Sequence, residues 1–142
     1  MNDPYDLQRF LTAQDPIYAK VCAELRAGFK RCHWMWFIFP QIKGLGSSSL
    51  SIKFAIPSRK EAEAYLAHPK LGFRLQECSR LVINCRQSRI EEIFRHPDNL
   101  KFWSCMTLFA RIEPHERVFD DALKKYYDGE LDPLTLEQFG QF

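Results

Sequence analysis

Proline constrains this chain more strongly than any other residue, because none of its eight prolines interrupts a helical pattern. Proline is tolerated at the first position of a helix, where its missing N–H needs no partner. Inside a helix it removes a hydrogen bond and clashes with the preceding turn. This pattern predicts a chain divided into several helices. Six prolines follow a residue that can cap a helix: Asp3-Pro4, Asp15-Pro16, His68-Pro69, His96-Pro97, Glu113-Pro114 and Asp132-Pro133.

Apolar residues between the prolines recur at helical spacing. Ile17, Val21 and Leu25 repeat every four residues, as one face of a helix requires. Gly28 then supplies a stop signal, because glycine adopts the left-handed conformation that often ends a helix. We therefore expect a helix over residues 16–27.

Two Ser-x-x-Glu sequences add capping boxes, in which the serine side chain accepts the N–H of the glutamate three residues later. They pair Ser58 with Glu61 and Ser88 with Glu91, and Asp98 offers a further cap. Together these signals predict about six to eight helices. The expected helices cover residues 4–13, 16–27, 58–67, 69–85, 100–111 and 114–127, with short ones near 93–94 and after 132.

Two segments depart from the helical period. Residues 31–39 include a run of six apolar side chains that Pro40 ends, and residues 50–56 alternate apolar with smaller or polar side chains. We interpret the first as a short buried strand and the second as another short strand. Helix is the alternative, because periodicity alone does not separate a short buried strand from a buried helix.

The length of 142 residues, with 46% hydrophobic residues, fits one mostly helical domain over residues 1–142 that forms a compact bundle. Twenty Lys and Arg against 18 Asp and Glu leave a net charge of +2, which does not indicate a basic surface that would bind nucleic acid or a membrane. The longest apolar run, at six residues, is far shorter than the roughly 20 of a membrane span. Five cysteines without a Cys-x-x-Cys pair fit free thiols, so we expect a soluble cytoplasmic protein.

The common cofactor and metal motifs are incomplete in this sequence. Gly44-Leu45-Gly46 lacks the third glycine of a dinucleotide fingerprint, and no phosphate-loop lysine follows it. His115-Glu116 begins like a zinc-protease motif, but position 119 is phenylalanine. We expect no metal site, and the sequence identifies neither a cofactor nor a reaction.

Three polar features remain as site candidates, and the first is His33. It stands beside Trp34 and shortly before the Gly/Ser-rich segment. Histidine titrates near neutral pH and can act as a general acid or base, which makes His33 the catalytic candidate. The alternative is a core histidine that bonds only to the backbone.

The second feature is the Gly/Ser-rich loop from Gln41 to Ser49. Glycines let backbone N–H groups point together around an anion, and serines add hydroxyl donors. The alternative is a flexible connection without a ligand. The binding candidates in this loop are Gln41, Gly44, Gly46, Ser47 and Ser48.

The third feature is the set Lys101, Ser104 and Thr107 on an otherwise apolar helix. At 100° per residue these side chains lie within about 120° of one another. Such a polar stripe can supply charge and hydrogen bonds to a ligand. The alternative is a stripe that faces water.

Several segments together resemble a known family, the bacterial domain of unknown function numbered 1810 (DUF1810), over nearly the whole chain. The resemblance implies a small, mainly helical cytoplasmic domain, and all three polar features fall in its signature segments. Members are sometimes labelled calpastatin, but such inhibitors are disordered chains, whereas this composition belongs to a packed domain. The matching segments are His33-Trp34-Met35-Trp36-Phe37-Ile38-Phe39-Pro40-Gln41, Gly44-Leu45-Gly46-Ser47, Glu61-Ala62-Glu63-Ala64-Tyr65-Leu66, Met106-Thr107-Leu108-Phe109 and Asp132-Pro133-Leu134-Thr135-Leu136, with Lys101 and Ser104.

We therefore expect one site for a small anionic, nucleotide-like metabolite. The glycine loop would hold the anion, Lys101 would supply charge, and Trp34 or Trp36 would stack on a flat ring. The alternative is a non-enzymatic protein-interaction module, which requires the aromatic segment 34–39 to form an exposed apolar patch. Nucleic-acid binding ranks third, because the net charge is weak.

Overall fold

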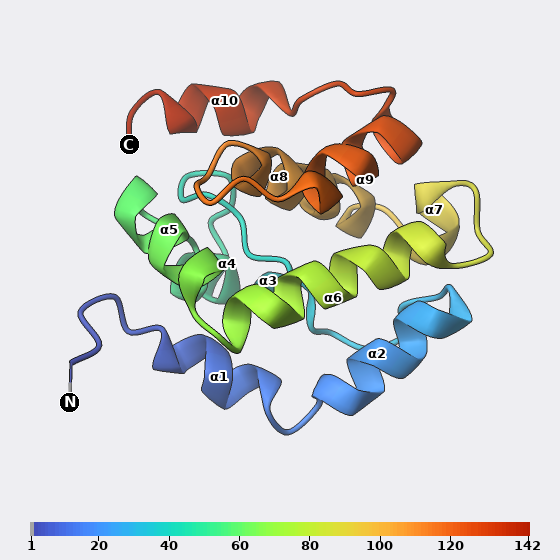
Figure 1. The fold of residues 1–142 in the computed structure, drawn as a ribbon, viewed down its shortest axis with the longest axis horizontal. Helices are drawn as coiled ribbons and strands as arrows, with labels where there is room; N and C mark the ends of the chain where they lie inside the picture. Colours follow the sequence, from blue (N-terminus) through green and yellow to red (C-terminus); the bar gives the residue numbers. More distant parts are fainter. Residues whose placement is uncertain (1) are drawn as a thin grey trace.

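The structure, a computed structural model, describes residues 2–142 and confirms a mostly helical fold (Figure 1). Within that range the only β-pairing is one parallel bridge between Ile42 and Ile56. No helix in that range combines the length and the apolar character that crossing a membrane requires. The described residues form ten helices: α1 (Gln8–Gln14), α2 (Tyr18–Ala27), α3 (Met35–Ile38), α4 (Ser49–Lys53), α5 (Arg59–Ala67), α6 (Leu71–Asn84), α7 (Ile90–Ile93), α8 (Asp98–Ala110), α9 (Arg117–Tyr127) and α10 (Pro133–Phe139).

Helices α6 and α8 form the centre of the fold. α8 packs against α9 and α10, while α6 packs against α2, α5 and α9. Aromatic side chains fill the space between them, and Phe39, Phe94 and Phe102 contact one another edge to face or tilted. Burying each such side chain contributes roughly 1.5–3 kcal/mol, so a core of this kind holds the helices without metal or disulfide bonds.

Local capping signals correctly predicted several helix ends. The Ser58 side chain accepts the N–H of Glu61 at 3.1 Å, and the Asp132 carboxylate accepts the N–H of Leu134 at 3.2 Å. Gly28 ends α2 with a left-handed φ of 80°. These contacts form between residues at most three apart, which is why sequence alone reveals them.

Other helix starts differ from the prediction. α1 begins at Gln8 instead of residue 4, because the Asp3 carboxylate accepts the N–H groups of Leu7 and Gln8 and keeps the preceding residues in a turn. The helices expected from residues 16, 69 and 114 begin at Tyr18, Leu71 and Arg117. Asp98 is the first residue of α8 and not its cap, because the cap position is Pro97. The Ser88 capping box is wrong, since Arg89 precedes α7 and no side chain caps it.

The two predicted strands are also wrong, because both segments contain helices. In residues 31–39 the helix α3 replaces a strand, and it is buried on most sides between α1, α6 and α8. An apolar run of this kind suits a short enclosed helix as well as a strand. In residues 50–56 the exposed α4 takes the first half, and only Phe54 and Ile56 turn inward.

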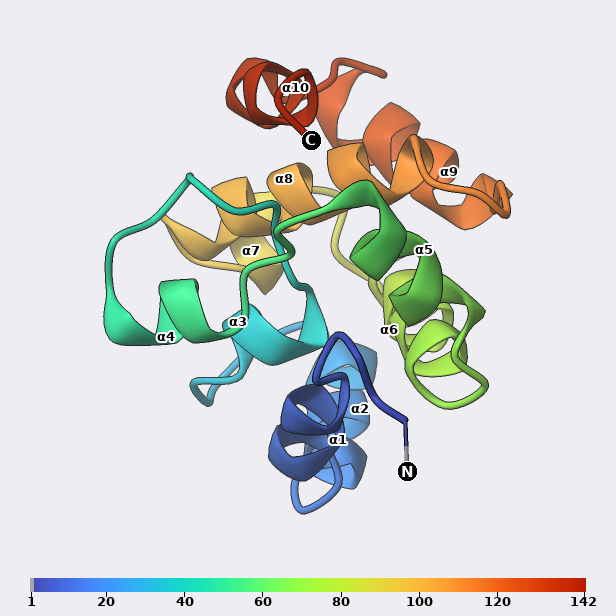
Figure 2. The same ribbon diagram turned by 90° about the vertical axis from the view of Figure 1, so that its left-hand side faces the viewer.

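The segment from residue 41 to 56 forms a lobe at one side of the helical core. Figure 2 shows α4 in this lobe, apart from α8 and α10. Arg9 holds the base of the lobe, because its guanidinium donates to the carbonyls of Lys53 and Ala55 and pairs with Glu61 at 2.7 Å. The opening between the lobe and α8 is where the candidate site lies.

Candidate functional site

A cavity of about 360 Å³ lies between the lobe and the pair α8–α10. The loop 41–46 and residues 51–55 supply one side, and the start of α8 with residues 132–134 supplies the other. The loop, two residues of the polar stripe on α8 and Trp36 of the aromatic segment therefore meet in one place, which His33 does not join. The predicted residues that line the cavity are Trp36, Gln41, Gly44, Gly46, Lys101 and Ser104.

Lys101 provides positive charge at the cavity wall. Its ammonium lies 4.5 Å from the centre of the Trp36 ring and 3.5 Å from Asp98 Oδ1. Asp98 makes its shorter ion pair, at 2.8 Å, with Lys30. The charge of Lys101 is thus only partly compensated, and the side chain stays about a quarter exposed. The nearby Lys43 also lines the cavity and is exposed.

Residues 44–46 line the same cavity and carry backbone N–H groups that are unpaired over the described residues. Lys43 N–H donates to the Ile56 carbonyl, but over the described residues the next four N–H groups donate to no protein acceptor. Gly44 has a φ of 103°, and a Cβ there would lie 2.6 Å from Gln138 Oε1. A Cβ on Gly46 would lie 2.7 Å from Ser51 Oγ. The positive φ of Gly44 favours glycine, and at both positions a Cβ would displace a neighbouring side chain.

Asp132 lines the cavity, although the sequence pattern indicated only a helix cap at this position. It is buried, and Oδ2 accepts hydrogen bonds from Ser104 at 2.6 Å and Thr135 at 2.7 Å. Thr107 is fully buried behind it and accepts the Asp132 N–H at 3.0 Å. Ser104 and Thr107 are thus committed to holding Asp132, and Thr107 does not line the cavity.

The structure does not bring four other candidates into the cavity lining. His33 lies on an exposed bend, and Trp34 is buried with its indole N–H donating to Glu24 at 2.9 Å. Ser48 caps α4 by accepting the Ser51 N–H, and Ser47 is exposed beside it. His33 and Trp34 precede α3, which is a helix instead of the predicted strand, and Ser47 and Ser48 lie at the start of α4.

Glu24 organises the loop that carries His33. One carboxylate oxygen accepts the N–H groups of Arg31 and Cys32 and the Trp34 indole N–H, while the other, Oε2, is buried without a partner among residues 2–142. Burial raises the pKa of Glu24, but these donors together lower it more, so the net pKa lies below its usual range. The loop 29–34 is therefore built around a buried anion.

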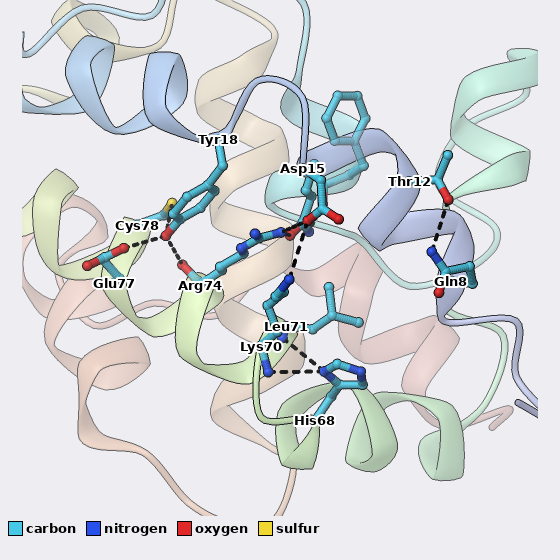
Figure 3. Close-up of polar contacts among 12 residues, drawn as sticks. Gln8, Thr12, Asp15, Tyr18, His68, Lys70, Leu71, Arg74, Glu77 and Cys78 are labelled. Carbon is cyan, nitrogen blue, oxygen red and sulfur yellow. Dashed lines mark hydrogen bonds and ion pairs between the residues drawn. The ribbon is translucent and has the colours of Figure 1, made fainter.

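A second polar cluster joins α2 to α6 away from the cavity (Figure 3). The Tyr18 hydroxyl donates to Glu77 at 2.6 Å, and Arg74 pairs with Asp15 at 2.8 Å. A hydrogen bond with Cys78 lowers the pKa of Cys22 to about 7, and the same bond raises the pKa of Cys78. These side chains contact one another, which indicates a structural junction.

The donor set in the cavity favours binding of an anion. Over the described residues 2–142, no group of three or more His, Cys, Asp or Glu side chains is placed to hold a metal ion. The free donors are the Lys101 ammonium and the loop N–H groups, and both favour negative charge.

Comparisons with known proteins give two matches. The model of the family DUF1810, described as a protein of unknown function, matches residues 4–139. The solved structure of the conserved hypothetical protein Rv1873 from Mycobacterium tuberculosis is 52% identical to this chain, with a TM-score of 0.95. That likeness covers 97% of this chain and 99% of the other. A comparison with curated proteins finds no match.

Proposed function

Since this chain belongs to the family DUF1810, whose description assigns no function, we propose from the geometry that it binds a small anionic, nucleotide-like metabolite. The ligand would occupy the cavity between the loop 41–46 and α8. The observation that carries the proposal is the position of Lys101 and of residues 44–46, whose backbone N–H groups are unpaired over the described residues, at the border of one cavity.

The cavity also has a suitable size and composition. Its volume of about 360 Å³ lies within the range of roughly 300–1,000 Å³ that small-molecule sites occupy. Its lining is mainly apolar, with a few polar side chains, namely Gln41, Lys43, Ser51, Lys101, Ser104 and Asp132. This mixture is typical of a ligand site, where apolar walls bury the ligand and a few polar groups orient it.

The contacts also define how such a ligand would bind. The Lys101 ammonium covers one face of Trp36, so a ring that stacked on this face would displace the ammonium. An anion that binds Lys101 and the loop N–H groups requires no such displacement. We therefore assign the anion to the Lys101 side of the cavity.

The interaction-module alternative has less support. It requires an exposed aromatic segment 34–39, but Trp34, Met35, Ile38 and Phe39 are buried, and only Trp36 and Phe37 are partly exposed. A cytoplasmic location remains part of the proposal, supported by five free cysteines and no disulfide among residues 2–142. We propose no nucleic-acid or membrane partner.

A thermal-shift panel of nucleotides, ADP-ribose derivatives and sugar phosphates tests the proposal. A ligand at about 100 times its dissociation constant adds about 2.7 kcal/mol to stability, which is roughly 5–10 °C for a domain of this size. We expect at least one compound to shift the wild type and the Lys124→Ala control but not Lys101→Ala. No shift from any compound, or an equal shift in Lys101→Ala, would contradict the proposal.

A further inference from the structure

The exposed large hydrophobic side chains are concentrated around the cavity. The most exposed in the described chain are Leu50, Ile52, Phe73, Leu100 and Leu134, at 42%, 65%, 58%, 43% and 62% exposure. Ile52, Leu100 and Leu134 all line the cavity, and Leu50 shares helix α4 with Ile52. Single exposed leucines are ordinary on a protein surface, but a group that surrounds one opening is not.

These side chains come from both sides of the opening. Ile52 belongs to α4 in the lobe, Leu100 belongs to α8, and Leu134 belongs to the first turn of α10. Figure 2 shows α4 on one side and α8 with α10 on the other. We call Ile52, Leu100 and Leu134 the apolar rim.

The rim differs in chemistry from the inner wall. The wall carries two lysines, Lys43 and Lys101, and the loop 44–46 adds unpaired N–H groups. Asp132 also lines the wall, but hydrogen bonds from Ser104, Leu134 and Thr135 occupy its carboxylate. Inside the cavity, the ring of Trp36 is already in contact with Lys101 at 4.5 Å. The apolar surface that remains available to a ligand is therefore the rim, which lies beside a wall that attracts negative charge.

We propose that the ligand is an anion that carries an apolar or flat aromatic group, with its charged end at Lys101 and its apolar group between Ile52 and Leu134. This inference rests on the proposed function and adds to it the class of ligand and its orientation. Charge complementarity fixes the inner end, and the rim fixes the outer end. Phosphate monoesters with organic tails have this chemistry.

A homologous series of phosphate monoesters measures the contribution of the rim. Methyl, butyl, hexyl and phenyl phosphate share one charged group and differ only in apolar surface. Each methylene that leaves water for an apolar contact strengthens binding roughly fourfold. Calorimetric titration of the intact protein with inorganic phosphate and each ester gives the dependence of Kd on tail size.

Three serine variants test whether the rim side chains cause the dependence of Kd on tail size. Ile52→Ser and Leu134→Ser remove rim contacts, and both side chains are exposed, so the core is unchanged. Phe73→Ser is the matched control, because Phe73 is equally exposed but lies on α6 away from the cavity. Analytical ultracentrifugation of the same samples reports whether the rim instead pairs two copies of the chain.

We expect the affinity of the wild type and Phe73→Ser to rise with tail length, and that of the two rim variants to rise much less. If inorganic phosphate and all esters bind with equal affinity, the anion site stands and the rim inference is overturned. If neither phosphate nor any ester binds, the proposed function fails for phosphate anions as well. A rim variant that abolishes self-association and leaves the dependence on tail length unchanged would also overturn the inference.

Discussion

The Lys101 ammonium lies 4.5 Å from the centre of the Trp36 ring, and the two side chains belong to α8 and α3. This contact explains how an ammonium is held at a mainly apolar cavity without a strong ion pair, because the ring face attracts a cation while leaving its N–H donors available. The shorter ion pair of Asp98 belongs to Lys30. Lys101 is thus ordered before any anion arrives.

His33→Ala is expected to leave ligand affinity within twofold of the wild type. His33 is exposed and does not line the cavity, although it precedes the aromatic segment in sequence. Calorimetric titration of a compound identified by the thermal-shift panel checks this, with Lys101→Ala as the comparison. A tenfold loss in His33→Ala would show that the cavity does not contain the whole site.

Gly44→Ala is expected to reduce the free energy of unfolding by more than Gly129→Ala. Both glycines have positive φ, 103° and 77°, so both substitutions strain the backbone, by about 1–2 kcal/mol. A Cβ on Gly44 also meets Gln138 at 2.6 Å, whereas nothing lies within 4 Å of one on Gly129. Urea unfolding measures the loss in free energy of unfolding for each variant. The difference between the two losses gives the cost of the contact with Gln138 apart from the backbone strain. Equal losses would contradict the prediction and show that the Gln138 side chain moves aside at no cost.

Asp132→Ala is expected to reduce the free energy of unfolding by about 2–4 kcal/mol, because it removes a helix cap and leaves buried hydroxyls without their acceptor. Those hydroxyls belong to Ser104 and Thr135. Ser104→Ala removes one donor only and should cost about 1 kcal/mol. Chemical denaturation measures both. A loss below 0.5 kcal/mol in Asp132→Ala, as for an exposed surface residue, would show that the carboxylate does not hold α10 to α8.

Glu24→Gln is expected to destabilise the protein at pH 7 by about 1–3 kcal/mol, because a charged acceptor bonds more strongly than a neutral amide. The donors around Glu24 hold its pKa below the ordinary 4.5 despite burial. A carboxyl with a lowered folded-state pKa stabilises the fold above its unfolded pKa, and this contribution is lost as pH falls through the folded value.

The difference in free energy of unfolding between wild type and Glu24→Gln should therefore be constant from pH 7 to about 5 and shrink below the unfolded pKa of about 4.5. Urea unfolding at a series of pH values checks this. A difference that does not change between pH 7 and pH 3 would contradict the assignment.

Local contacts account for the parts of the fold that sequence predicted well. The caps at Ser58 and Asp132 join residues at most three apart, so their side chains reveal helix starts directly. The proline pairs located most helices to within a few residues. The turn at Asp3 was missed because its carboxylate accepts N–H groups four and five residues ahead, which delays α1.

The candidate site was predictable only in part. Lys101 and Ser104 lie three apart on one helix, so the helical period placed them on one face, and glycines marked the loop that faces them. The helical period does not indicate how deeply a side chain is buried, and Thr107 is buried behind Asp132. Ile52 falls in the predicted strand 50–56, but it belongs to α4 and is exposed at the cavity opening.

The central claim is that an anion binds between Lys101 and the loop 41–46, and the indole N–H signals in a ¹⁵N-labelled sample test it most directly. Trp36 lines the cavity, while the indoles of Trp34 and Trp103 donate to Glu24 and Glu130. Spectra are recorded with AMP, ADP-ribose, ribose 5-phosphate and pyrophosphate, and Trp36→Phe assigns the signals. We predict that at least one compound moves the Trp36 signal and leaves the other two in place. Three stationary signals with every compound, or a shift confined to Trp103, would contradict the account.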